Sequence, residues 1–139
     1  MIILDTNVIS EPLRQQASAG VIAWIDRQPL ETLFLTTFTV AELRFCILAM
    51  PAGKRRAGMA SQVEENVLPR FAGRILPFDM AATLSYAIIM AGARAAGGAI
   101  ATTDGMIAAI AHANQMAVAT RDTGPFEAAG VRVINPWRE

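Results

Sequence analysis

The chain has 139 residues, 53% of them hydrophobic, and its twelve basic side chains balance twelve acidic ones. This length suits a single domain with a core of its own, which we expect to span residues 1–139. The single cysteine, Cys46, excludes an internal disulfide and a cysteine-based zinc site, and we expect it to be a buried small apolar residue.

The apolar start of the chain is interrupted at Asp5, which is not typical of a signal peptide. No apolar run reaches the roughly 18–20 residues that a membrane-spanning helix needs. We therefore expect a cytoplasmic protein that makes no membrane contact.

Short β-branched runs alternate with segments of helical period, a pattern that predicts an α/β domain with a parallel sheet. The first half begins with a strand at 2–4 and a short helix around Val21–Ile25 that ends before Pro29. A strand at 33–36 precedes a helix at 39–50, and a second helical segment over 54–71 ends at Pro69.

The second half begins with an extended segment at 74–78, after which Asp79 caps a helix that ends at Gly97-Gly98. A further helix is predicted at 103–113, and strands at 116–120 and 131–134. The apolar stripe expected along the helix that follows Asp79 consists of Met80, Leu84, Ile88, Ala91 and Ala95.

Four acidic residues stand out by position. Asp5 and Asp122 follow predicted strands, and in open α/β sheets ligands bind at the carboxyl ends of strands. Glu42 and Asp104 are expected in the first turns of helices, which border the same crevice. Because an acid on an apolar face is costly unless it is paired or metal-bound, the four together predict one polar site.

Each acid also has a purely structural explanation. Asp5 and Asp104 could be helix N-caps, and the spacing from Thr39 to Glu42 is that of a capping box. Asp122 could form an Asx-turn before Gly124-Pro125. Taken singly, these explanations are adequate, and only the positions of all four acids together favour a site.

The chain resembles ribonuclease toxins of the VapC type, which are PIN domains, and within them the FitB-like subgroup. Four ordered motifs and a closing NPW at 135–137 carry the resemblance across nearly the whole chain. The motifs are LDTNVIS at 4–10, TVAELR at 39–44, DGMIAA at 104–109 and ATRDTGPF at 119–126.

This resemblance implies a PIN fold, with a central, mainly parallel sheet of four to five strands flanked by helices. It further implies a metal-dependent endoribonuclease that is the toxin of a toxin–antitoxin pair, often acts on tRNA, forms a homodimer and is held inactive by a cognate antitoxin protein. The acids Asp5, Glu42, Asp104 and Asp122 would be both catalytic and metal-binding. The side chains that would support them are Thr6, Asn7 and Thr120.

Elementary chemistry agrees with this mechanism. Clustered carboxylates repel one another unless cations or shared protons lie between them, and oxygen ligands favour Mg²⁺ or Mn²⁺ over zinc. The sequence leaves open whether one or two ions bind. His112 is the only histidine, which excludes a two-histidine ribonuclease mechanism, and we expect it to be a surface or packing residue.

Two other functions share part of this pattern. A phosphatase of the haloacid-dehalogenase type also begins with a strand-end acid but needs a lysine near the phosphate, and Lys54 is the only lysine. A non-catalytic, Mg²⁺-binding module like the receivers of phospho-signalling would need a phosphorylatable Asp on a middle strand and a strand-end lysine. Finally, the predicted helix at 39–50 is apolar nearly all round, which favours burial against a second copy of the chain and an antitoxin helix.

Overall fold

Strand β1, Ile2–Leu4, lies at the centre of a five-stranded sheet in the computed structural model, which describes residues 1–139. The strand order is β3-β2-β1-β4-β5, and every neighbouring pair is parallel. The predicted parallel sheet is therefore confirmed. The other strands are β2 Leu33–Thr36, β3 Ile75–Leu76, β4 Ala117–Ala119 and β5 Val133–Ile134.

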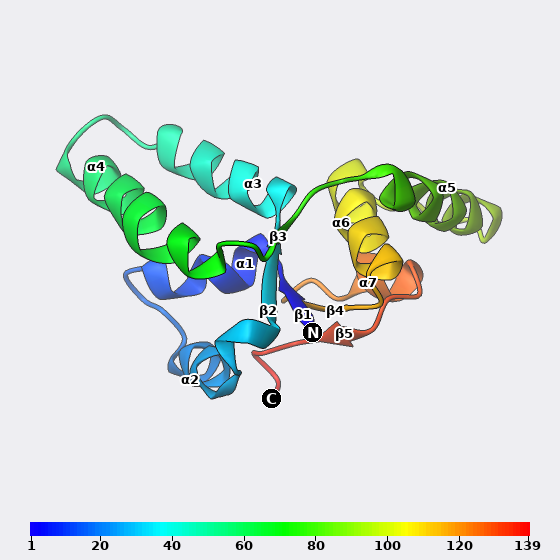
Figure 1. Cartoon of the computed structure of the whole chain (residues 1–139), viewed down its shortest axis with the longest axis horizontal. Coiled ribbons are helices and arrows are strands. Elements are labelled where there is room, and N and C mark those ends of the chain that lie inside the picture. Colours follow the sequence, from blue (N-terminus) through cyan, green and yellow to red (C-terminus); the bar gives the residue numbers. More distant parts are fainter.

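Seven α-helices flank the sheet, with α1 to α4 on one side and α5 to α7 on the other (Figure 1). None of them is both long and apolar enough to cross a membrane. The helices are α1 Thr6–Ile9, α2 Ala19–Arg27, α3 Thr37–Leu48, α4 Lys54–Ser61, α5 Met80–Ala95, α6 Thr102–Ala113 and α7 Gly124–Ala128.

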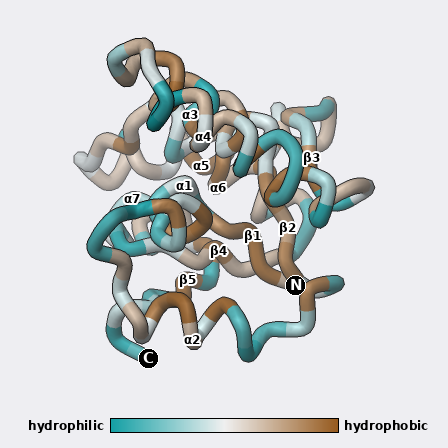
Figure 2. Tube along the Cα trace, turned by 90° about the vertical axis from the view of Figure 1, so that its left-hand side faces the viewer, coloured by the Kyte–Doolittle hydropathy of each residue, from teal (hydrophilic) through white to brown (hydrophobic).

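The core is divided by the sheet into two apolar clusters, one against each layer of helices. Ile3 and Val118 belong to the cluster under α5, α6 and α7. Leu4 and Leu35 belong to the cluster under α1, α2 and α3. Neighbouring residues of a strand point to opposite faces, so an uninterrupted apolar strand such as β1 serves both clusters. The hydrophobic strands accordingly run through the interior of the trace in Figure 2.

Helix α3 begins two residues earlier than predicted. The side chain of Thr36 caps it by accepting a hydrogen bond from the backbone N of Thr39 at 3.1 Å. Thr39 is therefore inside the helix, and the capping-box explanation of Glu42 is wrong. Glu42 lies in the second turn of α3, and its expected place in the first turn is also wrong.

The segment predicted as one helix over 54–71 is helical throughout but not uniform. Helix α4 continues into a π-helical stretch, Gln62–Val67, and then a 3₁₀ turn, Leu68–Phe71. Pro69 lies at the start of that last turn, where its missing N–H costs no hydrogen bond, and so it does not end the segment.

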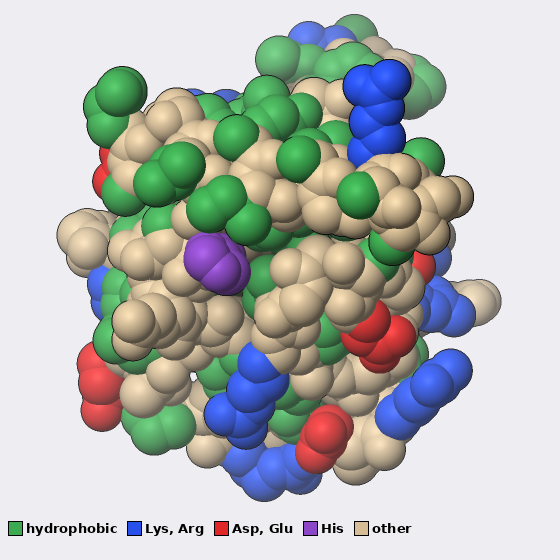
Figure 3. All heavy atoms as spheres, turned by 90° about the vertical axis from the view of Figure 1, so that its right-hand side faces the viewer, with side chains coloured by type: hydrophobic (Ala, Val, Ile, Leu, Met, Phe, Trp, Pro, Cys, Tyr) green, Lys and Arg blue, Asp and Glu red, His purple; other side chains and the backbone are tan.

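Three large apolar residues of α5 point outward, against expectation. Met80, Leu84 and Ile88 are 83%, 67% and 56% exposed. The buried side of α5 consists mainly of smaller side chains: Ala82, Ser85, Ile89 and Ala93. Figure 3 looks onto this side of the molecule and shows hydrophobic side chains gathered over its upper part.

Helix α5 packs against α6 through its other face. A Cβ added to Gly105 of α6 would lie 2.7 Å from Sδ of Met90 and 3.3 Å from the ring of Tyr86, both on α5. The missing side chain of Gly105 therefore leaves the space that Met90 and Tyr86 occupy. These two side chains pack against the core, whereas Met80, Leu84 and Ile88 lie on the outside.

Candidate active site

An open cavity of about 460 Å³ lies where β1 and β4 end, and all four predicted acids line it. Asp5 directly follows β1, and Asp122 lies three residues beyond the end of β4. Glu42 comes from α3, and Asp104 from the first turn of α6. The remaining lining residues are Thr6, Asn7, Ser10, Phe45, Cys46 and Phe126.

Asp5 is the most firmly held of the four acids. Its Oδ1 accepts from the backbone N of Thr6 at 2.8 Å, which caps α1. Its Oδ2 accepts from Nδ2 of Asn7 at 2.7 Å and from Oγ1 of Thr120 at 2.7 Å. The N-cap explanation of Asp5 is thus correct, and yet the same carboxylate lines the cavity.

Burial raises the pKa of Asp5 above its usual value. The hydrogen bonds from Thr120, Thr6 and Asn7 oppose this rise, whereas the charge of Glu42 adds to it. These donors therefore stabilise the ionised form of Asp5 in a place where burial disfavours it.

Asp104 and Asp122 face the cavity without such support. Neither carboxylate accepts a hydrogen bond from the protein, in contrast to Glu42, which accepts one from Oγ1 of Thr6. Residue Ala101 holds the N-cap position of α6, so the N-cap explanation of Asp104 is wrong. The carboxylate of Asp122 forms no Asx-turn hydrogen bond either.

The pKa of Asp104 is raised, first by burial and then by the charges of Asp5, Asp122 and Glu42. The other three acids therefore act on Asp104 through their charge, as one electrostatic unit. A cation placed among them would relieve the repulsion and satisfy the free oxygens of Asp104 and Asp122.

No three acidic, histidine or cysteine side chains converge tightly enough to form a ready-made set of metal ligands. This arrangement still fits Mg²⁺, because that ion keeps several of its waters and needs only one or two carboxylates directly. A lining of oxygen ligands without histidine suits Mg²⁺ or Mn²⁺ better than zinc.

Cys46 was predicted to be buried, and this is wrong. The thiol is exposed, and Cys46 lines the cavity one helical turn after Glu42. The spacing of four residues, which puts both side chains on one face of α3, was the available signal. His112 is exposed as expected, with Nδ1 2.9 Å from Oγ of Ser85, and it does not line the cavity.

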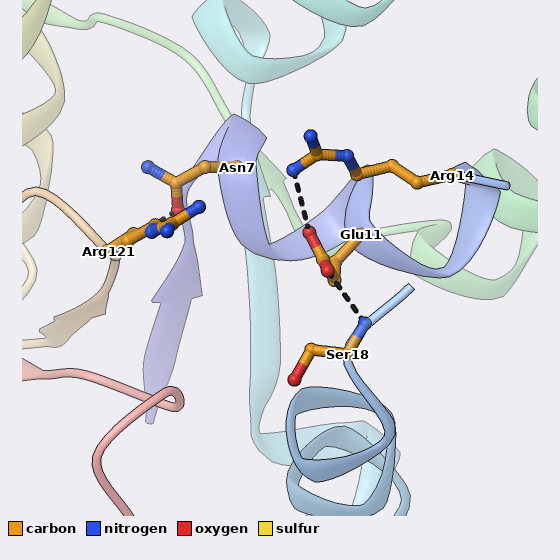
Figure 4. A network of polar contacts seen from close by, with 5 residues as sticks. All are labelled: Asn7, Glu11, Arg14, Ser18 and Arg121. Carbon is orange, nitrogen blue, oxygen red and sulfur yellow. Dashed lines mark hydrogen bonds and ion pairs between the residues drawn. The ribbon is translucent and has the colours of Figure 1, made fainter. Parts of the chain in front are cut away.

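A second buried acid, Glu11, was not singled out in the sequence and has a structural role. It is 3% exposed, accepts from the backbone N of Ser18 at 2.8 Å and pairs with Nη1 of Arg14 at 3.2 Å. Figure 4 shows these contacts beside Asn7 and Arg121. Glu11 thereby fixes the loop that connects the first helical segment to α2.

The sequence profile of the PIN domain family matches residues 2–131. The plasmid stability protein StbB of Pseudomonas syringae pv. tomato is 60% identical to this chain, and a VapC ribonuclease of Sinorhizobium fredii is 57% identical. These alignments cover 99% of this chain in both cases, and 99% and 98% of the two relatives.

Toxin FitB of Neisseria gonorrhoeae is 50% identical over the full length of both chains. The crystal structure of FitAcB from the same organism superposes with a TM-score of 0.97, again with 50% identity and full coverage of both chains. The similarity therefore extends over all the elements that surround the cavity.

Proposed function

Because this chain belongs to the PIN domain family, we propose that it is a metal-dependent endoribonuclease and the toxin of a toxin–antitoxin pair. The VapC ribonuclease and Toxin FitB, which match it end to end, support this activity. The observation that carries the proposal is the shared cavity of Asp5, Glu42, Asp104 and Asp122.

In this proposal the four acids are the catalytic residues and hold one or two divalent ions, Mg²⁺ or Mn²⁺. A bound ion of this kind lowers the pKa of a water and stabilises negative charge on a phosphate. Thr120 and Asn7 orient Asp5 and oppose the rise of its pKa, and Thr6 orients Glu42. Asp104 and Asp122 present free carboxylate oxygens to the cavity.

The test is cleavage of a labelled single-stranded RNA with Mg²⁺, Mn²⁺ or chelator. Asp5→Asn and Asp104→Asn keep the side-chain shape and remove a charge, so cleavage should fall at least about a hundredfold while circular dichroism stays unchanged. Asp26→Asn, on the exposed side of α2, is the matched control and should cleave like the wild type.

Near-wild-type cleavage by both cavity variants would contradict the assignment of the four acids as the catalytic residues. Hydrolysis of a phosphomonoester in preference to RNA would favour the phosphatase alternative. Mg²⁺ binding without any hydrolysis would favour the receiver-like module.

The antitoxin is proposed to bind next to the cavity. A second hollow of about 520 Å³ lies between the segment after α1 and helices α3 and α4. It shares Ser10 and Cys46 with the acidic cavity, so a chain bound there can reach the four acids. Phe45 and Leu48, both exposed on α3, add apolar surface at this end of the molecule.

Helix α3 was expected to pack against a second copy as well as the antitoxin, but the homodimer is instead proposed to form through α5. Its exposed residues Met80, Leu84 and Ile88 make a continuous stripe at the spacing of four residues that one helix face requires. A stripe of this kind is usually covered in a stable protein. A second copy can cover it with its own α5, since the same patch serves both partners of a two-fold dimer.

A further inference from the structure

Arg121 is the basic residue nearest in sequence to the acidic cavity, and it forms no ion pair. It lies between Thr120 and Asp122, which lines the cavity. The two ion pairs of the chain are Arg14 with Glu11 and Arg44 with Glu64. The guanidinium of Arg121 thus forms an ion pair with none of the four carboxylates.

The guanidinium of Arg121 lies instead over the indole of Trp137, with its Cζ 5.5 Å from the ring centroid. A cation over an aromatic face is attracted by the ring but uses none of its N–H donors there. Arg121 is exposed, and its donors are therefore available to an acceptor from outside the protein.

Three hydrogen bonds between backbone groups and the side-chain amides of Asn7 and Asn135 connect this pair to the site. The backbone N of Arg121 donates to Oδ1 of Asn7 at 3.1 Å, and its carbonyl accepts from Nδ2 of Asn135 at 3.4 Å. Oδ1 of Asn135 in turn accepts from the backbone N of Trp137 at 3.0 Å. Nδ2 of Asn7 also donates to Asp5, so the side-chain amide of Asn7 links Arg121 to Asp5. Figure 4 shows Asn7 next to Arg121.

We propose that Arg121 is a positioning residue that binds a backbone phosphate of the RNA next to the one cleaved, and that Trp137 holds its guanidinium ready for this contact. The proposal rests on the ribonuclease function. An RNA strand carries a negative charge at every phosphate, and the acidic cavity repels the phosphates that are not being cleaved. A guanidinium on the residue that precedes Asp122, which can bind a phosphate with two parallel N–H bonds, offsets that repulsion.

The experiment measures kcat and KM for a labelled oligoribonucleotide over a range of salt concentrations. Arg121→Ala should raise KM about tenfold and leave kcat within about threefold, since the lost contact is uniform binding. The slope of log(kcat/KM) against log salt should become shallower by about 0.7, the value for one phosphate contact on a single strand.

Other variants separate charge from geometry. Arg121→Lys should keep the wild-type salt slope but recover only part of KM, because an ammonium lacks the planar fork. Trp137→Leu should raise KM by a smaller factor with the slope unchanged. Arg138→Ala is the control, since the side chain of this exposed neighbour forms no ion pair and no cation–π contact. An Arg121→Ala enzyme with wild-type KM and salt slope, or one with a defect in kcat alone, would overturn the proposal.

Failure of the ribonuclease function gives a different result, because then the wild type itself cleaves no RNA. In that case the affinity of the Asp104→Asn protein for uncleaved RNA is measured by fluorescence anisotropy, with and without the additional substitution Arg121→Ala. This comparison tests the Arg121 contact independently of cleavage. Weaker binding with the shallower salt slope supports the contact, and unchanged binding refutes it.

Discussion

Oγ1 of Thr120 donates to Oδ2 of Asp5 at 2.7 Å and so ties the ends of β4 and β1 together across 115 residues of sequence. Thr120 is fully buried, and its hydroxyl opposes the effect of burial on the pKa of Asp5. This hydrogen bond therefore stabilises the sheet and also favours the ionised form of Asp5.

Thr120→Val removes the hydroxyl and keeps the shape of the side chain. We expect the free energy of unfolding to fall by about 1–3 kcal/mol, because a buried carboxylate loses one of its donors. Urea unfolding in chelator measures the change, and Thr120→Ser should retain most of the stability. Equal stability of the Val and wild-type proteins would mean that Asn7 and Thr6 satisfy Asp5 alone.

The metal-free protein should lose stability as pH rises. Burial and mutual repulsion raise the folded-state pKa of Asp104 and of Asp5, so protonation of these acids favours folding. That contribution is complete below the ordinary pKa of 3.8 and is lost as pH rises through the raised values. Melting of the wild type in chelator should therefore shift downward over this window.

Asp104→Asn should flatten this pH dependence and melt higher than the wild type in chelator, since one of the repelling charges is gone. Millimolar Mg²⁺ or Mn²⁺ should raise the melting temperature of the wild type and have little effect on the variant. Asp26→Asn, outside the cavity, should follow the wild type in every condition. A wild type that is indifferent both to metal and to pH would contradict the electrostatic picture.

The homodimer proposed through the exposed stripe of α5 can be tested by introducing one charged residue into that stripe. Leu84→Lys places an ammonium in the middle of the stripe, and light scattering at micromolar concentration should show a monomer. The same substitution at Leu30, an exposed leucine away from α5, should leave the wild-type dimer intact. A wild type that scatters as a monomer would remove the proposal itself.

A methyl group at Gly105 should crowd the side chains of α5 that lie over it. In Gly105→Ala the new Cβ would lie 2.7 Å from Sδ of Met90, a flexible side chain that can move, and 3.3 Å from the ring of Tyr86, so stability should fall by about 1 kcal/mol. Met90→Ala in the same chain should recover part of this loss. Gly58→Ala in α4, where nothing lies within 4 Å, should instead raise stability by about 0.5–1 kcal/mol.

The proximity of Asp5 and Asp122 was predictable because it depends on the topology of the sheet. Parallel strands bring their carboxyl ends to one edge of the sheet, so an acid after β1 and an acid soon after β4 must be neighbours. The strand bounds of β1 and β2 followed equally well from their uninterrupted apolar runs.

Features that depend on the distance between two helices were not predictable in this way. Tyr86 and Met90 of α5 pack over Gly105 of α6, which lies 15 residues beyond Met90 in sequence, and no hydrophobic periodicity within α5 contains that information. The exposure of Cys46 likewise depends on what lies opposite α3. Apolar neighbours in sequence indicated burial, whereas the open cavity leaves the thiol accessible.

The central place of β1 has a consequence for synthesis of the chain on the ribosome. The first strand to emerge, β1, pairs with β4, Ala117–Ala119. The set of hydrogen bonds to Asp5 is complete only when Thr120 is present. A nascent chain that stops before this point carries Asp5 and Glu42 but lacks Asp122 and the strand that aligns the acids. On the proposed assignment of the four acids, the nuclease site is therefore assembled only when translation is almost finished.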